Sequence, residues 1–419
     1  MNKSILFKLA TSFWILTGLL YVNCHIKPAD PGEAVGNALP ETFMPNVPPE
    51  ESMNNSYKLK LEWHGNDSDG VIAAYEYRID GELFDNTWQR TRYHYEHFKF
   101  RNGWYTIEIR SVDNKGGIDP TPVKRKFHVK GPTFSRGILL IDNDIQTVDT
   151  QDQFKDALID SILMGAGFLN YTVWDYDQMF GIWEKPVFVD SSVDVNGNTY
   201  YGLSAYSTII WTVGTGSDQT DAQNSLSKIE ATLMDYLDMG GNLWISGVRP
   251  MLALLGSHPS GTRLAPASLS RKYLHIQSAD TLSCEHDIFL GVEPGYDDIP
   301  TKYVFERTGQ TDYLGYIRES FFSTNQIIPE PDADPLFVFS DNVYPFEQVG
   351  VTHQINLAKY AHTPCAIRYR GENYVAITFG FPLVQVTMRG GRKNKLDQEA
   401  LRQCARQILV NEFGETPDF

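Results

Sequence analysis

The stretch Tyr206–Gly247 constrains the fold of this chain more than any other. It begins with a short apolar run, Ser207–Gly214 (STIIWTVG), and continues with a helical pattern over Leu226–Met239. A second apolar run, Asn242–Gly247 (NLWISG), closes it. Strand, helix and strand at this spacing predict two parallel strands joined by a crossover helix. Buried parallel strands need further strands beside them, so we expect a large α/β sheet.

Patterns on both sides of this unit extend the predicted sheet. They are the apolar runs Gly137–Asp142 (GILLID) and Tyr171–Trp174 (YTVW), a helical pattern over Asp152–Met164, a hairpin over Ala366–Tyr369 and Glu372–Phe379, and a last helix over Leu396–Phe413. Helical patterns that alternate with short apolar runs indicate a doubly wound, mostly parallel sheet. We therefore predict an α/β domain over residues 136–414, with an insertion at about 256–365.

A different pattern occupies residues 52–131. The runs Tyr57–Trp63 (YKLKLEW) and Trp104–Val112 (WYTIEIRSV) alternate between apolar and polar residues, as half-exposed antiparallel strands do. Turn-forming pairs such as Asp80-Gly81 and Asn102-Gly103 separate the runs. Short alternating strands without a helical period predict an all-β sandwich.

The same region resembles a known family. The segments Trp63–Gly70 (WHGNDSDG), Tyr75–Tyr77 (YEY) and Arg110–Asn114 (RSVDN), with Thr121-Pro122 before a last strand, are similar to fibronectin type III-like domains. The resemblance covers nearly the whole region. It implies a β-sandwich of the kind common in secreted bacterial proteins.

The acidic turn Asn66–Gly70 has two interpretations. Oxygen ligands at alternate positions before a glycine suit calcium, which makes Asp67 and Asp69 candidate metal ligands. The EF-hand pattern is incomplete, because Tyr77 stands where its twelfth residue should be Glu. In the other interpretation the Asp side chains accept hydrogen bonds from the turn and Gly70 takes a positive φ. We expect the turn, and no pattern elsewhere indicates a cofactor.

The first 24 residues are expected to be a signal outside the fold. Lys3 and Lys8 precede an apolar run, Leu9–Val22, that is short for a membrane span, and Cys24 follows closely. This arrangement resembles a bacterial lipoprotein signal peptide, which implies cleavage and a lipid on Cys24. Tyr21 departs from the usual pattern, so ordinary secretion or an uncleaved anchor remains an alternative. We predict export to the cell envelope, at the outer membrane or cell surface.

Residues 25–51 carry six prolines and few large apolar side chains. Such a segment buries too little surface to offset the entropy lost on ordering. It is therefore predicted to be an extended, solvated tether that holds the folded domains away from a membrane surface.

The α/β region also resembles a family. The segments ILLIDND, YTVWDYD, STIIWTVG and LMDYLDMGGNLWISG, and a late Gly380–Pro382 (GFP), are similar to the class I glutamine amidotransferase-like superfamily, which is flavodoxin-like. Catalytic members carry a Cys at a strand-to-helix elbow, and the matching position here holds Ser246. The resemblance makes Ser246 a candidate nucleophile, with His286 beside Asp287 as its candidate base.

The surroundings of Ser246 depart from the catalytic pattern. Trp244 replaces the glycine two residues before it, Pro250 follows closely, and no His-x-Glu pair lies near the C-terminus. The alternative is a small residue where the strand turns tightly, and we favour it. Ligand binding is instead expected at the carboxylates that follow two predicted strands, Asp142, Asp144 and Asp175.

Two further segments allow several interpretations. The insertion could be a cap over the carboxyl ends of the strands, a carboxylate metal site or a partner-binding surface, and we favour a cap that binds a ligand. Met388–Lys395 (MRGGRKNK) is a basic cluster that is expected to be a solvated loop, with contact to an anionic ligand as the alternative.

Composition narrows the functional classes. A net charge of −16 argues against a nucleic-acid-binding surface. Aromatic residues make up 13% of the chain, which indicates strand packing, with a sugar-stacking surface as the alternative. Beyond Cys24, the cysteines Cys284, Cys365 and Cys404 are odd in number, so either one disulfide and a free thiol or three thiols fit.

These features predict an exported, membrane-anchored binding or scaffold protein rather than an enzyme, engaging a protein or a glycan. No cofactor and no nucleic acid are expected. The alternative is a serine hydrolase that uses Ser246 with a histidine of the insertion.

Overall fold

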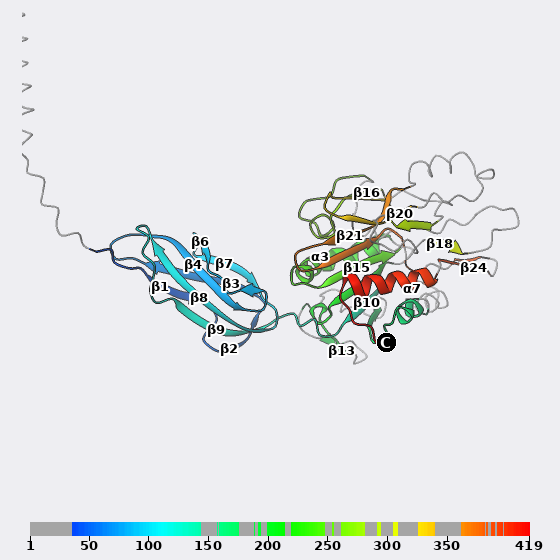
Figure 1. Cartoon of the computed structure of the whole chain (residues 1–419). Coiled ribbons are helices and arrows are strands. Elements are labelled where there is room, and N and C mark those ends of the chain that lie inside the picture. The colour runs from blue at the N-terminus through cyan, green and yellow to red at the C-terminus, as the bar shows by residue number, and fades with distance from the viewer. Residues whose placement is uncertain are drawn as a thin grey trace, which may run out of the picture. The chain divides into compact units, whose positions relative to one another are not determined.

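The computed structural model describes residues 36–143, 157, 159–175, 188, 192–193, 199–213, 219–247, 254, 261–280, 291–294, 305–308, 326–339, 362–381, 383, 387–389, 392–396 and 398–419 (Figure 1). They fall into two compact units. One is centred on Lys60–His97 with Thr106–Lys126, and the other on Phe127–Phe419. No helix within these ranges is long and apolar enough to cross a membrane.

The all-β unit is built from two sheets. The smaller has the order β1-β3-β7, and the larger has the order β2-β9-β8-β4-β5, with β6 also paired to β4. The strands are β1 (Glu41–Asn46), β2 (Ser52–Ser56), β3 (Lys58–Asn66), β4 (Ile72–Gly81), β5 (Phe84–Asp85), β6 (Gln89–Thr91), β7 (Tyr95–Lys99), β8 (Gly103–Asp113) and β9 (Val123–Lys130). The alternating runs of the sequence form β3 and β8, as predicted.

The core of this unit lies between the two sheets. Every second residue of β8 is buried from Tyr105 to Ile109, and Leu61 and Trp63 of β3 are fully buried. The polar residues between them face outward, which is how a two-sheet sandwich places an alternating sequence. The prediction of an all-β sandwich is confirmed.

Strand β1 corrects the predicted tether. Within residues 25–51, Glu41–Asn46 pairs antiparallel with β3, and Thr42 and Met44 are buried. The segment is short, and Pro45 stands near its end on an edge strand, where a missing N–H costs little. Proline content therefore concealed a strand, and the tether prediction does not hold for these six residues.

The second unit contains a mixed sheet whose described strands number eleven. Five pair in parallel in the order β11-β10-β14-β15-β22, and six continue antiparallel as β21-β20-β17-β18-β24-β23. The bounds are β10 (Ile138–Asn143), β11 (Thr172–Asp175), β14 (Thr208–Val213), β15 (Asn242–Gly247), β17 (Gly291–Pro294), β18 (Phe305–Thr308), β20 (Asp334–Phe339), β21 (Pro364–Arg370), β22 (Val375–Phe379), β23 (Thr387–Arg389) and β24 (Arg392–Leu396). The expectation of a mostly parallel sheet holds for the first five strands only.

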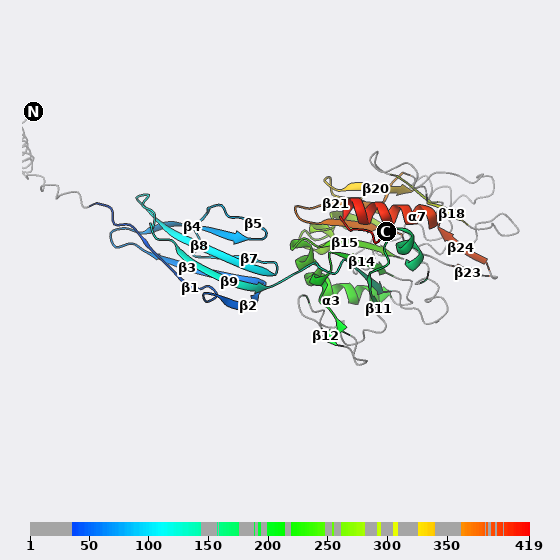
Figure 2. The ribbon, with the colours of Figure 1, turned by 60° about the horizontal axis from the view of Figure 1, so that its bottom comes forward.

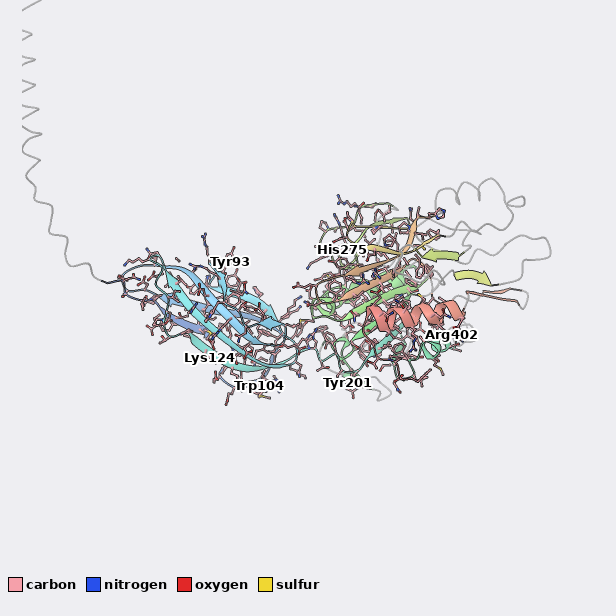
Figure 3. The ribbon with its side chains drawn as sticks, viewed as in Figure 1. Tyr93, Trp104, Lys124, Tyr201, His275 and Arg402 are labelled. Carbon is pink, nitrogen blue, oxygen red and sulfur yellow. The ribbon has the colours of Figure 1, made fainter. Side chains whose placement is uncertain are left out.

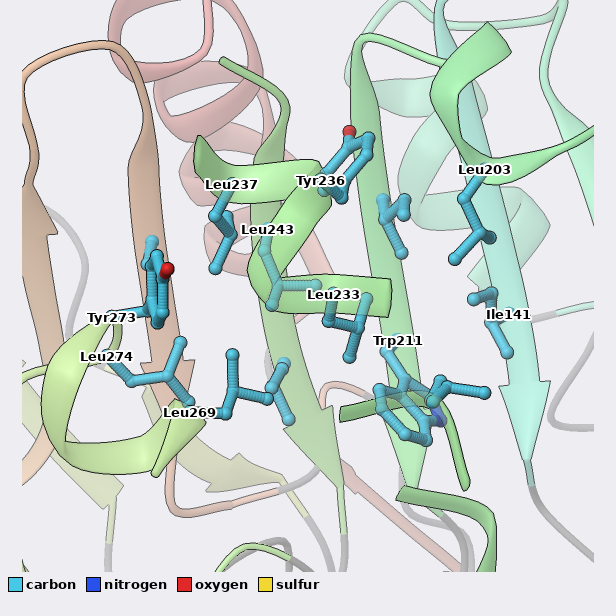
Figure 4. Packing of buried hydrophobic residues seen from close by; sticks show 14 of the residues in the cluster. Ile141, Leu203, Trp211, Leu233, Tyr236, Leu237, Leu243, Leu269, Tyr273 and Leu274 are labelled. Carbon is cyan, nitrogen blue, oxygen red and sulfur yellow. The ribbon is translucent and has the colours of Figure 1, made fainter. Parts of the chain in front are cut away.

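Helices cover both faces of the parallel strands (Figure 2). Helix α3 (Gln219–Asp238) packs on one face, where Leu233 and Tyr236 meet strand residues such as Leu243 (Figure 4). Helix α7 (Gln398–Arg406), continued by a π-helical segment, packs on the other. Each strand thus sends alternate residues into two separate apolar clusters. The predicted crossover unit, β14-α3-β15, is confirmed.

The described part of the insertion lies beside the parallel strands. Its strands β20, β17 and β18 lengthen the main sheet. Strands β16 (Ile276–Asp280) and β19 (Gln326–Pro329) pair separately and, with α5 (Leu269–Lys272), join the cluster on the α3 face. These segments do not form the expected cap over the carboxyl ends of the strands. The basic segment is a hairpin, β23 with β24, instead of the expected loop.

Candidate functional site

Polar residues end three neighbouring parallel strands at the same level. Asp142 of β10 lies opposite Thr212 of β14, and Thr212 lies opposite Ser246 of β15. Because side chains alternate along a strand, all three lie on the face that α7 covers. Ligands of α/β proteins bind at the carboxyl ends of parallel strands. This polar edge, Asp142, Thr212 and Ser246, is therefore the candidate site.

Thr212 connects the first two strands of the polar edge. Its hydroxyl oxygen lies 3.3 Å from Asp142 Oδ1 and 3.3 Å from the Ile141 carbonyl oxygen. A hydroxyl has one proton, so it donates to one of these acceptors at a time. Asp142 is half-buried, whereas Thr212 is buried. Asp142 is thus the least buried of the three residues of the polar edge.

Ser246 is fully buried. Its hydroxyl donates to the Phe381 carbonyl oxygen over 2.9 Å and accepts from the Leu383 amide over 3.0 Å. The side chain therefore joins the end of β15 to the segment that follows β22. A serine nucleophile passes its proton to a base. Here the proton is directed at a main-chain carbonyl, so the bond to Phe381 would have to break before a base could take the proton.

Replacing Ser246 with alanine is expected to lower the free energy of unfolding by about 1–3 kcal/mol. The substitution removes the hydroxyl that bonds to both the Leu383 amide and the Phe381 carbonyl. Urea unfolding, followed by circular dichroism, measures the change. Ser246→Thr, which keeps a hydroxyl, serves as the comparison, and an alanine variant as stable as the wild type would contradict this account.

A histidine–carboxylate pair lies at the opposite end of the strands. His275 Nδ1 is 2.7 Å from Asp332 Oδ1, and the imidazole stacks on the Tyr369 ring with centroids 3.3 Å apart. Tyr369 is level with Leu243 of β15 through their shared partner in β22. That level is three residues, about 10 Å, before Ser246 along the strand. The pair does not belong to the polar edge.

The remaining predicted residues of this unit are placed in part. The backbone of Asp175 is in register with Asp142 at the polar edge. Asp144 and His286 lie outside the described residues. Thr212 was not predicted, although its place near the end of the run STIIWTVG marked it as a polar residue at the carboxyl end of a buried strand.

The acidic turn of the all-β unit is held by a lysine. Lys115 Nζ donates to the carbonyl oxygen of Asp69 over 3.2 Å and to its Oδ2 over 2.7 Å. The hydrogen bond from Lys115 lowers the pKa of the Asp69 carboxyl, and the same bond raises the pKa of Lys115. Asp67 Oδ1 accepts from the Asp69 amide, as expected of a turn. An ammonium group thus lies against the oxygens that a calcium ion would use.

Gly70 corrects one detail of the turn. It does not take a positive φ. A Cβ at this position would lie 2.3 Å from Asp67 Oδ2 and 2.6 Å from Asn114 Oδ1. Glycine is required here because two side-chain oxygens converge on its Cα.

Calcium at ~1 mM, a concentration that fills extracellular calcium modules, is expected to leave the melting temperature of the protein unchanged. The Lys115 ammonium already neutralises Asp69. Differential scanning fluorimetry in calcium or in magnesium at equal ionic strength checks this. A rise of several degrees in calcium alone would show that the ion displaces the lysine.

Other metal and thiol chemistry is limited in the described ranges. No group of three or more His, Cys, Asp or Glu side chains there is arranged to hold a metal ion. Cys365 and Cys404 are thiols outside any disulfide, both buried in the cluster on the α7 face, and burial raises the pKa of the Cys404 thiol. Of the pairings left open, a bond between these two is therefore absent, and Cys284 lies outside the described residues.

No protein-family model matches the chain, and no curated protein sequence does. Among solved structures, the fibronectin(III)-like modules of Clostridium thermocellum CbhA are 20% identical over 22% of this chain, with a TM-score of 0.19. The PKD1 domain of Vibrio anguillarum Epp is 18% identical over 23% of this chain, with a TM-score of 0.18. The PKD1 domain of the Vibrio cholerae metalloprotease PrtV is 15% identical over 22%, with a TM-score of 0.16.

The likenesses differ in how much of the other protein they cover. This chain spans about half, 48%, of the CbhA chain, and 99% and 96% of the two PKD1 domains. They say nothing of a ligand or a reaction.

Proposed function

We propose that this chain is an exported, membrane-anchored binding or scaffold protein, without catalytic activity of its own, that engages a protein or a glycan. The observation that carries the proposal is the state of Ser246. The one residue that the catalytic pattern offers as a nucleophile is buried, and its hydroxyl bonds to two main-chain groups.

The second unit is proposed to be an amidotransferase-like domain that keeps the fold and not the chemistry. The parallel order β11-β10-β14-β15-β22 and the helices on both faces support this assignment. At its polar edge the least buried group is the Asp142 carboxylate, an acceptor that suits hydrogen-bond donors of a ligand. The polar edge would then bind a ligand without catalysing a reaction on it.

A fluorophosphonate probe tests the absence of catalysis. It labels activated serines, so the mature protein is expected to remain unlabelled at a concentration that saturates a control serine hydrolase. Labelling that disappears in Ser246→Ala would instead establish the serine hydrolase that is the alternative. Labelling that persists in Ser246→Ala would place an active serine elsewhere and would also contradict the proposal.

Anchoring is supported by the signal pattern and Cys24. Cells that express the full chain are grown with radiolabelled palmitate. Incorporation into the wild type and its loss in Cys24→Ala are expected. If the wild-type protein is not labelled, the lipid anchor is rejected in favour of ordinary secretion or an uncleaved signal.

A further inference from the structure

A group of aromatic rings lies on and just before β7. The ring centroids of Tyr93 and Tyr95 are 6.5 Å apart, those of His94 and Tyr95 are 5.2 Å apart, and those of Tyr95 and His97 are 5.7 Å apart. Lys60 of the neighbouring β3 places its Nζ 4.4 Å from the centre of the Tyr95 ring. These five residues are the β7 aromatic cluster.

Most of the cluster faces solvent, and Tyr95 at its centre is partly buried. Tyr93 is 66% exposed and projects from the surface of the all-β unit (Figure 3), and His94 and His97 are exposed as well. Core packing explains the buried rings of this unit, such as Trp63, but it does not explain these. Single exposed rings are ordinary, whereas a contiguous group of them indicates a binding surface.

The backbone beneath the cluster is held in place. The Trp63 main-chain amide donates to the His94 carbonyl over 2.9 Å, and the Trp63 indole N–H donates to the Tyr93 carbonyl over 3.0 Å. Trp63 itself is fully buried. A surface fixed before binding loses little entropy when a ligand arrives.

The chemistry of the cluster suits a carbohydrate. Each ring presents an apolar face and carries a phenol or an imidazole nitrogen that can hydrogen-bond. A sugar offers the complement, with C–H groups on one face and hydroxyls at its edge. The cluster includes no aliphatic side chain that would supply the dry centre of a protein interface.

Charge narrows the class of carbohydrate. Lys60 pairs with Glu62 over 2.5 Å, so the cation of the cluster is balanced by a carboxylate. The whole chain carries a net charge of −16, which repels anionic polymers. An uncharged ligand meets no such repulsion.

From this we propose that the β7 aromatic cluster binds an uncharged polysaccharide by stacking sugar rings on Tyr93 and Tyr95. The inference rests on the proposed binding function and names its ligand class and its surface.

Native gels that contain an uncharged polysaccharide test the proposal. Xylan, mannan and a β-glucan are the probes, with polygalacturonate as the charged comparison and the mature full chain as the protein. We expect at least one uncharged polymer to retard the protein. Tyr93→Ala combined with Tyr95→Ala should weaken the apparent affinity by about tenfold, and Tyr93→Phe, which keeps the ring, should bind as the wild type does.

Trp104→Ala is the matched control, because Trp104 is 44% exposed and lies on β8 of the other sheet (Figure 3). Its affinity should not change. If the double variant fails to fold, the affinity of Tyr93→Ala alone tests the proposal, since the Tyr93 side chain is 66% exposed. The proposal is overturned if no uncharged polymer binds, if only polygalacturonate binds, or if the alanine variants bind as tightly as the wild type. If no uncharged polymer binds and Ser246 stays unreactive towards the fluorophosphonate probe, this inference fails while the proposed binding function stands, with a protein or another glycan as its ligand.

Discussion

Replacing Arg368 with methionine is expected to lower the free energy of unfolding of the second unit by about 3–5 kcal/mol. Arg368 is a charged side chain of which only 2% is exposed. Its guanidinium bonds to Asp334 over 2.8 Å and to Glu412 over 2.7 Å. Glu412 is itself only 9% exposed, so the substitution leaves a buried carboxylate with less compensation.

Arg370 provides a matched control for Arg368. It also bonds to Glu412, over 2.9 Å, but 49% of its side chain is exposed. Ion pairs at such sites contribute less than about 1 kcal/mol, so Arg370→Met should be nearly neutral. The helical circular dichroism signal reports on the second unit, because the described helices belong to it. Equal urea midpoints for Arg368→Met and Arg370→Met would show that the buried pair of Arg368 and Glu412 does not contribute more to stability than the exposed one.

Replacing Trp63 with alanine is expected to destabilise the all-β unit by about 3–5 kcal/mol. Trp63 is fully buried, lies 5.6 Å from Tyr77 between ring centroids, and donates its indole N–H to the Tyr93 carbonyl. The substitution opens a cavity and leaves that carbonyl without its donor. Scanning calorimetry should show a fall of at least about 10 °C in the melting temperature of this unit.

Trp104→Ala removes a ring of the same size that is 44% exposed and packs edge-on against His128, so it should cost only about 1–2 kcal/mol. The comparison separates burial from residue type. If the two tryptophan variants have the same melting temperature, the stability of the sandwich core does not depend on Trp63.

Local patterns were enough to predict much of the fold. The alternation in YKLKLEW and WYTIEIRSV arises because one face of each strand is buried, so β3 and β8 could be identified directly. The middle parts of β14 and β15, residues 209–211 and 243–245, are apolar because helices cover both faces of these strands. In each case the burial of the side chains follows a regular pattern along the strand, and that pattern is visible in the residue types.

The missed features depend on contacts between distant residues. Strand β1 exists because β3 supplies its hydrogen bonds, and nothing within Glu41–Asn46 reveals that partner. Strands β20, β17 and β18 add to a sheet whose other members lie elsewhere in the sequence. Pairing of this kind leaves no local period.

The candidate site shows the same division. The polar edge was expected at Asp142, because a carboxylate after an apolar run is visible in the sequence. The state of Ser246 was not predictable, because its partners Phe381 and Leu383 lie 135 and 137 residues away. The sequence located Ser246 at a strand-to-helix turn, and only the structure showed the hydrogen bonds that hold its hydroxyl.

Strand β1 also limits how far the protein can reach from a bilayer. With a lipid on Cys24, the chain enters the sandwich at Glu41, seventeen residues later. A chain of that length spans at most about 60 Å when fully extended. Because β1 and β7 both pair with β3, the same seventeen residues also limit the distance between the lipid and the β7 aromatic cluster. With such a lipid in place, the ligand must come within roughly 100 Å of the membrane, which is the extended chain plus the length of β3. A polymer attached to the same envelope could then bind where one kept at a greater distance could not.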